Sequence, residues 1–149
     1  MELIVGQQAP AFESKDQHGK TVKLSDFQGK KLIMYFYPKD DTPGCTAQSC
    51  NLRDNYESLQ KQGFQVIGIS SDDEKSHQKF IAKYNLPFNL LADTDQSIHQ
   101  KYGTWGEKQM FGKKYMGTFR TTFVLDEQGK ILEIIKKVDT AEHTKQIVK

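Results

Sequence analysis

Hydrophobic residues follow two different periods along this chain, one typical of buried strands and one typical of amphipathic helices. Continuous apolar runs over residues 31–37 and 64–70 predict two strands that are covered on both faces. Between them, apolar residues recur at helical spacing over 46–59, and Gly63 stands where a helix commonly ends. The pattern therefore predicts two parallel strands joined by a crossover helix.

The segments on either side of this unit supply further elements. Segments 11–14 and 21–24 flank a turn containing Gly19 and predict a short N-terminal hairpin. Acidic capping residues precede a helical pattern that ends at Tyr84. The remaining expected elements are a strand over 89–92, a short helix over 95–102, and a hairpin with strands over 120–125 and 130–138. This order predicts a three-layer α/β sandwich, and we expect one domain spanning residues 1–149.

Composition and charge narrow the class of protein. Of the 149 residues, 36% are hydrophobic, which is enough for one core and too few for two full-sized domains. The longest uninterrupted apolar run spans six residues, 32–37, whereas a membrane-spanning helix needs about 20. We find no secretory signal, and therefore expect a soluble, cytoplasmic protein without a membrane partner. The 21 basic and 19 acidic side chains are scattered, which disfavours a dedicated nucleic-acid binder.

One of the two cysteines stands at the start of a predicted helix, directly after the first buried strand. Thr42 suits the N-cap and Pro43 the first helical position, which places Cys45 in the first turn. Free backbone amides and the helix dipole favour a thiolate there, by typically about 0.3–1 kcal/mol. Because this contribution is small, a reactive Cys45 also needs a neighbouring cation. The alternative is that Cys45 is a small, buried apolar residue.

Cys50, the second cysteine, lies five residues further along the same predicted helix. On an intact α-helix this spacing separates the two Cα atoms by about 8–9 Å, on nearly opposite sides. A disulfide needs Cα atoms within about 7 Å, so Cys45 and Cys50 can bond only when the first helical turns unravel. The pair therefore differs from a redox Cys-x-x-Cys motif, whose tighter loop closes without such remodelling.

The residues around Cys45 resemble the active-site signature of peroxiredoxins. Pro38, Thr42 and Cys45 match its Pro-x-x-x-Thr-x-x-Cys pattern. The position of Cys50 and the segments 52–54, 68–70, 105–108 and 120–123 are similar to one branch of that family, bacterioferritin comigratory protein or peroxiredoxin Q. The resemblance covers nearly the whole chain, and it implies a thioredoxin-like fold with an added N-terminal β-hairpin.

The resemblance also implies a role for each matching residue. Cys45 would be the peroxidatic nucleophile, Thr42 a hydroxyl partner for its sulfur and for the peroxide, and Arg120 the required cation. Pro38 would shield the sulfur from water. Cys50 would condense with the sulfenic acid at Cys45, and thioredoxin or a similar dithiol would reduce the resulting intramolecular disulfide. We therefore expect a monomeric thiol peroxidase that reduces hydrogen peroxide and organic hydroperoxides without metal, haem or flavin.

Each assignment has a simpler alternative. Thr42 could be only a helix cap, Pro38 only the end of a strand, and Arg120 only a solvated strand residue. Cys50 could be inert, and Gln48 could either orient neighbouring groups or face solvent. Two other functions stay open: a thiol–disulfide oxidoreductase, which would favour cysteines three residues apart, and a peroxide-sensing redox protein.

Several aromatic, methionine and histidine residues lie outside this chemistry. Trp105, Met110, Phe111, Tyr115 and Met116 are expected to pack in a core or loop, or to form an apolar rim for organic peroxides. The histidines are scattered, with no neighbouring carboxylate or cysteine, so we expect no metal or base role for His18, His77, His99 or His143.

Overall fold

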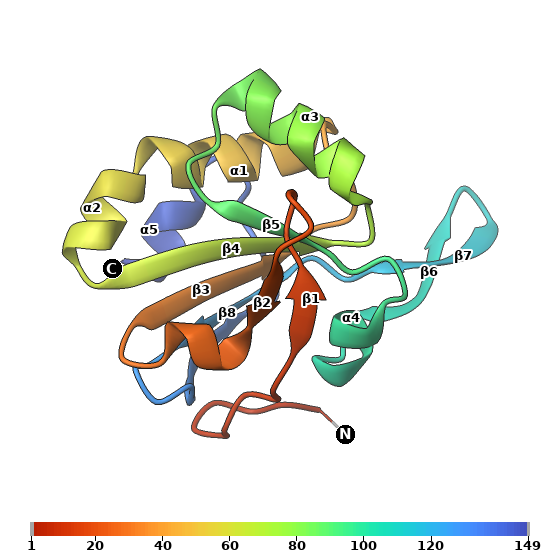
Figure 1. The fold of residues 1–149 in the computed structure, drawn as a ribbon. Coiled ribbons are helices and arrows are strands. Elements are labelled where there is room, and N and C mark those ends of the chain that lie inside the picture. The colour runs from red at the N-terminus through yellow and green to blue at the C-terminus, as the bar shows by residue number, and fades with distance from the viewer. Residues whose placement is uncertain (1, 149) are drawn as a thin grey trace.

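The structure, a computed structural model, describes residues 2–148 and contains a central five-stranded sheet (Figure 1). Its strands are β3 (Lys31–Phe36), β4 (Phe64–Ser70), β5 (Asn89–Ala92), β8 (Thr121–Leu125) and β9 (Ile131–Ile135). They lie in the order β5-β4-β3-β8-β9. β3, β4 and β5 are parallel, whereas β8 and β9 pair antiparallel with their neighbours. The predicted parallel unit and the predicted C-terminal hairpin are therefore both present.

Helices and a small hairpin cover the two faces of this sheet (Figure 1). One face carries α1 (Pro43–Asp54), α2 (Tyr56–Lys61), α3 (Glu74–Tyr84) and α5 (His143–Ile147). The other carries the hairpin of β1 (Glu13–Lys15) and β2 (Thr21–Lys23), a 3-10 helix over Leu24–Phe27, and α4 (Ser97–Lys101). The expected three-layer α/β sandwich with an N-terminal hairpin is confirmed. Across residues 2–148, every helix is too short or too polar to cross a membrane.

Alternation along β3 explains why nearly all of this strand is apolar. Leu32, Met34 and Phe36 belong to the core beneath the N-terminal hairpin and α4. Ile33 and Tyr35 point to the opposite face and belong to the core beneath α1 and α3. Each buried side chain of this size contributes about 1.5–3 kcal/mol relative to leaving it exposed. A strand at the centre of a sheet therefore supports both layers and holds α1 on one of them.

The predicted helix over 46–59 is divided at Asn55. α1 ends at Asp54, and Asn55 takes φ −107° and ψ 7°, which is outside the helical region. Its side-chain Nδ2 donates a hydrogen bond of 2.8 Å to the carbonyl oxygen of Asn51. Such a local bond competes with continuation of the helix. After α2 the chain turns at Gly63, where φ is +90°, as the sequence predicts.

The segment between α4 and β8 forms an arm that projects from the body of the molecule (Figure 1). It consists of the antiparallel strands β6 (Trp105–Met110) and β7 (Lys113–Thr118). Of the placements expected for its large side chains, packing in a core is wrong for four of them, which are exposed: Met110, Phe111, Tyr115 and Met116. The physical reason is that a two-stranded ribbon standing away from the sheet has no second layer to bury its faces.

Candidate active site

Cys45, the candidate nucleophile, lies in the first turn of α1, directly after the loop that follows β3. Thr42 is the N-cap of α1 and Pro43 its first residue, so Cys45 falls in the first turn. Its side chain is only 1% exposed and packs in the core beneath α1. Free amides of the first turn and the positive end of the helix dipole therefore surround a sulfur that bulk water scarcely reaches.

Arg120, which is distant from Cys45 along the chain, contacts this sulfur in the folded protein. Antiparallel pairing of β8 with β3 places Thr121 opposite Phe36, so the residue before Thr121 lies at the end of β3 where α1 begins. From there Nη2 of Arg120 donates to Sγ of Cys45 at 3.1 Å. The guanidinium of Arg120 passes close to the backbone of Gly44, where an added Cβ would lie 3.4 Å from Nη2. The sheet register therefore supplies the cation that a reactive thiol in this turn requires.

Gln48 holds the guanidinium in this position. Its side chain is fully buried one turn after Cys45, and its Oε1 accepts a hydrogen bond of 2.7 Å from Nη1 of Arg120. Of the two alternatives from the sequence, orientation of a neighbouring group therefore holds and exposure to solvent does not. Its Nε2 finds no hydrogen-bond partner in the described part of the chain.

Thr42 and Pro38 lie in the loop that leads into α1. The hydroxyl of Thr42 donates to the carbonyl oxygen of Lys39 at 2.8 Å rather than to Sγ of Cys45. Thr42 thus occupies the N-cap position without a side-chain bond to a helix amide. Its oxygen keeps lone pairs with which it can accept a hydrogen bond. Pro38 is half-buried and follows Tyr37, a buried core residue just after the end of β3.

The two thiols are both free and sit on one continuous helix. Cys50 is half-buried, and burial raises the pKa of its thiol. With α1 intact, five residues of helix hold the Cα atoms of Cys45 and Cys50 about 8–9 Å apart, beyond the reach of a disulfide.

The loop before α1 is anchored by a buried carboxylate that the sequence did not single out. Asp40 accepts hydrogen bonds from the hydroxyl of Tyr37 at 2.6 Å and from Oγ of Ser76 at 2.8 Å. Nδ1 of His77 lies 2.7 Å from the same carboxylate, and Nε2 of His77 lies 2.9 Å from the carbonyl oxygen of Leu91. The active-site loop is thereby tied to α3 and β5.

The expectation that the histidines have no carboxylate partner is wrong for two of them. His77 contacts Asp40, and Nδ1 of His99 lies 2.6 Å from Oδ2 of Asp93. The His77–Asp40 pair could not be predicted from the sequence, because 37 positions separate the two residues. Asp93 and His99 are close in sequence, and their pairing depends on the turn before α4, where Asp93 also accepts from the backbone amide of His99. The pairs fasten α3 and α4 to their neighbours.

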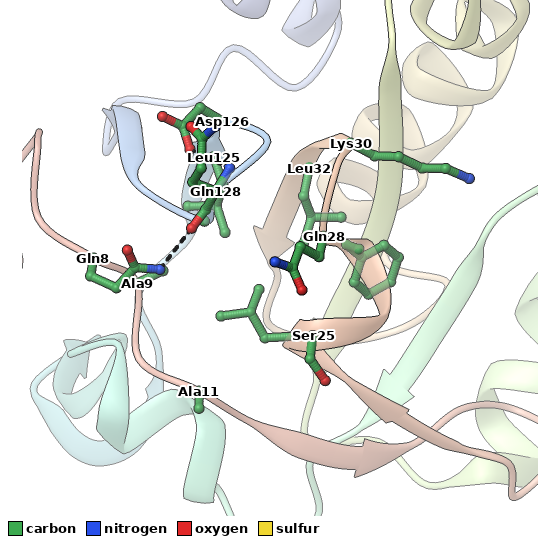
Figure 2. A pocket seen from close by; sticks show the side chains of 13 residues that line it. Gln8, Ala9, Ala11, Ser25, Gln28, Lys30, Leu32, Leu125, Asp126 and Gln128 are labelled. Carbon is green, nitrogen blue, oxygen red and sulfur yellow. Dashed lines mark hydrogen bonds between the residues drawn. The ribbon is translucent and has the colours of Figure 1, made fainter.

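A cavity of about 450 Å³ lies at the end of the sheet opposite to Cys45 (Figure 2). Leu32, near the start of β3, and Leu125, the end of β8, form part of its lining. Its rim carries amides, and Nε2 of Gln8 donates to the carbonyl oxygen of Gln128 at 2.9 Å (Figure 2). Because Cys45 and Arg120 lie at the other end of these strands, this cavity is separate from the reactive sulfur.

Comparisons with known proteins agree with this geometry. Residues 5–134 match the model of the AhpC/TSA family. A curated relative from Coxiella burnetii, named putative peroxiredoxin bcp, is 49% identical over 148 residues, which cover 99% of this chain and 98% of that protein. Peroxiredoxin Bcp from Bacillus subtilis is 45% identical over 143 residues, covering 96% of this chain and 91% of that one.

A solved structure is similar over most of its length. It is that of the bacterioferritin comigratory protein of Xanthomonas campestris, described for its alkyl peroxide reduction activity. The TM-score is 0.86 at 32% identity, and the match covers 91% of this chain and 87% of that one. The thioredoxin-like fold expected from the sequence is therefore confirmed. Together with the cysteine and the guanidinium that meet at the start of α1, these relatives show that the chain belongs to the AhpC/TSA family and is a peroxiredoxin, a thiol-dependent peroxidase.

Proposed function

We propose that this chain reduces hydroperoxides through a sulfenic acid at Cys45, which Cys50 resolves as an intramolecular disulfide and thioredoxin then reduces. The observation that carries the proposal is the 3.1 Å contact between Nη2 of Arg120 and the sulfur of a cysteine in the first turn of α1. A cation and free helix amides at one sulfur favour the thiolate, which is the nucleophilic form.

In the first step, the Cys45 thiolate attacks one oxygen of the hydroperoxide. An S–O bond forms while the O–O bond breaks, the sulfur is oxidised to sulfenic acid, and the departing oxygen takes a proton and leaves as water or alcohol. Arg120 stabilises the negative charge that develops on the departing oxygen. The Thr42 hydroxyl donates its hydrogen bond to the carbonyl oxygen of Lys39, so its lone pairs are left to accept a hydrogen bond from the peroxide. Pro38 limits access of water to the sulfur.

In the second step, Cys50 attacks the sulfur of the sulfenic acid, so that a disulfide forms and water leaves. The first turns of α1 must unravel for this bond to form, because the intact helix holds the two residues too far apart. A thiolate of thioredoxin then attacks the disulfide and forms a mixed disulfide between the two proteins. The second thiol of thioredoxin attacks this mixed disulfide and releases the reduced protein. Two electrons thereby pass from thioredoxin to the protein.

The oxidation and resolution steps use only groups that the chain itself carries. The sulfur of Cys45 supplies both electrons to the peroxide, and both cysteines lie in one chain, so we propose a monomer that works without metal, haem or flavin. A reducing cytoplasm suits a disulfide that must be reopened after each turnover. Hydrogen peroxide and organic hydroperoxides are the proposed substrates, and the alkyl peroxide reduction described for the Xanthomonas campestris protein supports the second.

Mass spectrometry of the thiols after one equivalent of hydrogen peroxide tests the roles of the two cysteines. We expect the wild type to lose two hydrogens and form the Cys45–Cys50 disulfide. Cys50→Ser should complete one fast oxidation and accumulate a sulfenic acid that dimedone traps, whereas Cys45→Ser should not react. A first oxidation that fails in Cys50→Ser and persists in Cys45→Ser would reverse the assignments.

Turnover separates this proposal from the two alternatives. With thioredoxin, thioredoxin reductase and NADPH, a peroxidase consumes peroxide continuously. A peroxide-sensing protein would show one stoichiometric burst, and a thiol–disulfide oxidoreductase would react faster with a disulfide substrate than with hydrogen peroxide. Cysteines five residues apart disfavour the oxidoreductase, because its motif needs the tighter loop.

A further inference from the structure

The arm of residues 105–118 presents apolar side chains to solvent that the fold does not use. Phe111, at its tip, is 97% exposed. Met110 and Met116 are more than half exposed, and Tyr115 is also open to solvent. Met110 ends β6 at the tip, whereas Tyr115 and Met116 lie on β7 nearer the body. The register places Met110 and Tyr115 on one face of the ribbon and Met116 on the other, so the arm is apolar at its tip and on both faces of β7. Several large apolar side chains exposed together on one element are typical of an interaction site.

Phe111 also occupies a backbone position that aromatic residues avoid. It has φ +52°, and Gly112 after it has φ +77°, so the two form the tight turn between β6 and β7. Turns with two positive φ angles favour asparagine, aspartate or glycine at the first position. A left-handed conformation costs another residue about 1–2 kcal/mol. Because the exposed ring gains no burial in return, folding alone gives no reason for phenylalanine here.

Charge on the arm restricts the kind of partner that fits it. The arm carries three lysines, at 108, 113 and 114, against one acidic residue, Glu107. Its excess positive charge therefore equals the net +2 of the whole chain. Two copies of such an arm repel each other, whereas a partner with acidic side chains around an apolar surface is attracted.

The base of the arm is continuous with the reactive site. β7 ends at Thr118, and the ring of Phe119 covers Gly106 so closely that an added Cβ there would lie 2.7 Å from it. The next residue, Arg120, contacts Sγ of Cys45. A protein seated along the arm therefore lies beside the helix that carries both cysteines.

We propose that the arm is the docking surface for the protein dithiol that reduces the Cys45–Cys50 disulfide, a partner with an apolar patch bordered by acidic side chains. This inference rests on the proposed function. Tyr115 and Met116 carry the apolar surface back along β7 from the tip, which favours a protein over a lipid surface. Docking holds the partner's thiolate near the disulfide, so that attack forms the mixed disulfide and the partner's second thiol releases it.

Phe111→Asn and the double variant Lys113→Glu/Lys114→Glu test the docking surface. Asparagine suits the left-handed turn position, so we expect the melting temperature of Phe111→Asn to equal or exceed that of the wild type. For both variants we expect the second-order rate constant for reduction by thioredoxin to fall roughly tenfold, as loss of an interface anchor does. Reduction by dithiothreitol and oxidation of Cys45 by hydrogen peroxide should be unchanged.

Leu132→Asn is the matched control, because Leu132 is 48% exposed on β9, outside the arm. It should leave reduction by thioredoxin unchanged. Arm variants that thioredoxin reduces as fast as the wild type would overturn the docking surface and leave the proposed function intact. If thioredoxin reduces the arm variants at the wild-type rate, and these variants no longer co-sediment with phosphatidylglycerol vesicles as the wild type does, the arm is a membrane-binding surface instead. A wild-type disulfide that dithiothreitol reduces and thioredoxin does not would overturn the choice of reductant, and the docking surface with it.

Discussion

Nη2 of Arg120 lies 3.1 Å from Sγ of Cys45, although 75 positions separate the two residues in the chain. The other guanidinium nitrogen, Nη1, donates to Oε1 of the buried Gln48 at 2.7 Å. One planar group therefore bridges two side chains of the same helix. This geometry needs two donors in a rigid fork, which arginine has and lysine lacks.

Arg120→Lys should retain the charge and lose the bridge. We expect the second-order rate constant for oxidation of Cys45 by hydrogen peroxide to fall about 10²- to 10³-fold, the loss typical of removing one donor from developing negative charge. Stopped-flow competition with a second peroxidase measures it. Arg53→Lys is the control. Arg53 lies in the last turn of α1, away from Cys45, and its Nη1 donates to the carbonyl oxygen of Tyr84 on α3. An Arg120→Lys rate within a factor of about two of the wild type would contradict the bridging role.

Asn51 ties the C-terminal segment to α1, the helix that the proposed disulfide requires to unravel. Its Nδ2 donates to the carbonyl oxygen of Ala141 at 2.9 Å, and its Oδ1 accepts from the amide of Thr144 at 2.7 Å. Removing bonds of this kind costs about 1 kcal/mol each, and the two together cost about 2 kcal/mol, so we expect Asn51→Ala to speed disulfide formation by up to roughly thirtyfold. Rapid quenching after peroxide and mass spectrometry follow the step.

A faster second step also leaves the sulfenic acid exposed for less time. We therefore expect Asn51→Ala to form less sulfinic acid at high peroxide. Gln62→Ala is the matched control, since it removes a side-chain bond to Ser58 on α2 and leaves α1 untouched. Unchanged disulfide formation in Asn51→Ala would show that release of the C-terminal segment does not limit the step.

Asp40→Asn should destabilise the fold more than the neighbouring Asp41→Asn. Asp40 is buried and side chains contact both of its oxygens, so the asparagine amide, which has one oxygen, leaves at least one of these groups facing an N–H donor. Disrupting a buried charged network of this kind costs about 3–5 kcal/mol. Asp41 is exposed, where the ammonium of Lys83 lowers its pKa, and an exposed ion pair of this kind contributes little to stability. Urea unfolding of both variants measures the difference, and equal midpoints would refute it.

His143 should make stability fall in mild acid. Burial lowers the pKa of His143, and the charge of Arg120 acts in the same direction, while Asp139 and Glu133 oppose it. Below the unfolded pKa of about 6.5, the unfolded chain therefore binds a proton that the folded protein does not. The stability from His143 is present above that pH and is lost as the pH falls toward its folded pKa.

Melting temperatures between pH 7.5 and pH 5.5 test this dependence. His143→Asn should show a smaller decrease over that window than the wild type, because the proton-linked difference at this residue is gone. His18→Asn changes an exposed histidine and should leave the decrease unchanged. Identical slopes in His143→Asn and the wild type would contradict the prediction.

Local patterns predicted the elements that depend on neighbours in sequence. The apolar runs located β3 and β4, and the Thr42-Pro43 pair located the start of α1, because period and capping act over a few residues. The break at Asn55 was missed, since the apolar spacing continues across it while a side-chain bond ends the helix. The arm was missed as a hairpin because no local rule tells an exposed aromatic residue from a buried one.

The sequence by itself determined that a thiol stands in the first turn of a helix after a central strand, and that a second thiol is too far along that helix to reach it. Residue patterns alone did not bring Arg120 to the sulfur; that followed from resemblance, and the pairing of β8 with β3 accomplishes it. The partnership of Asp40 with His77 likewise exists only in the folded chain. Periodicity specifies which face of its own element a residue occupies, whereas the neighbour across that face depends on how sheets and helices pack.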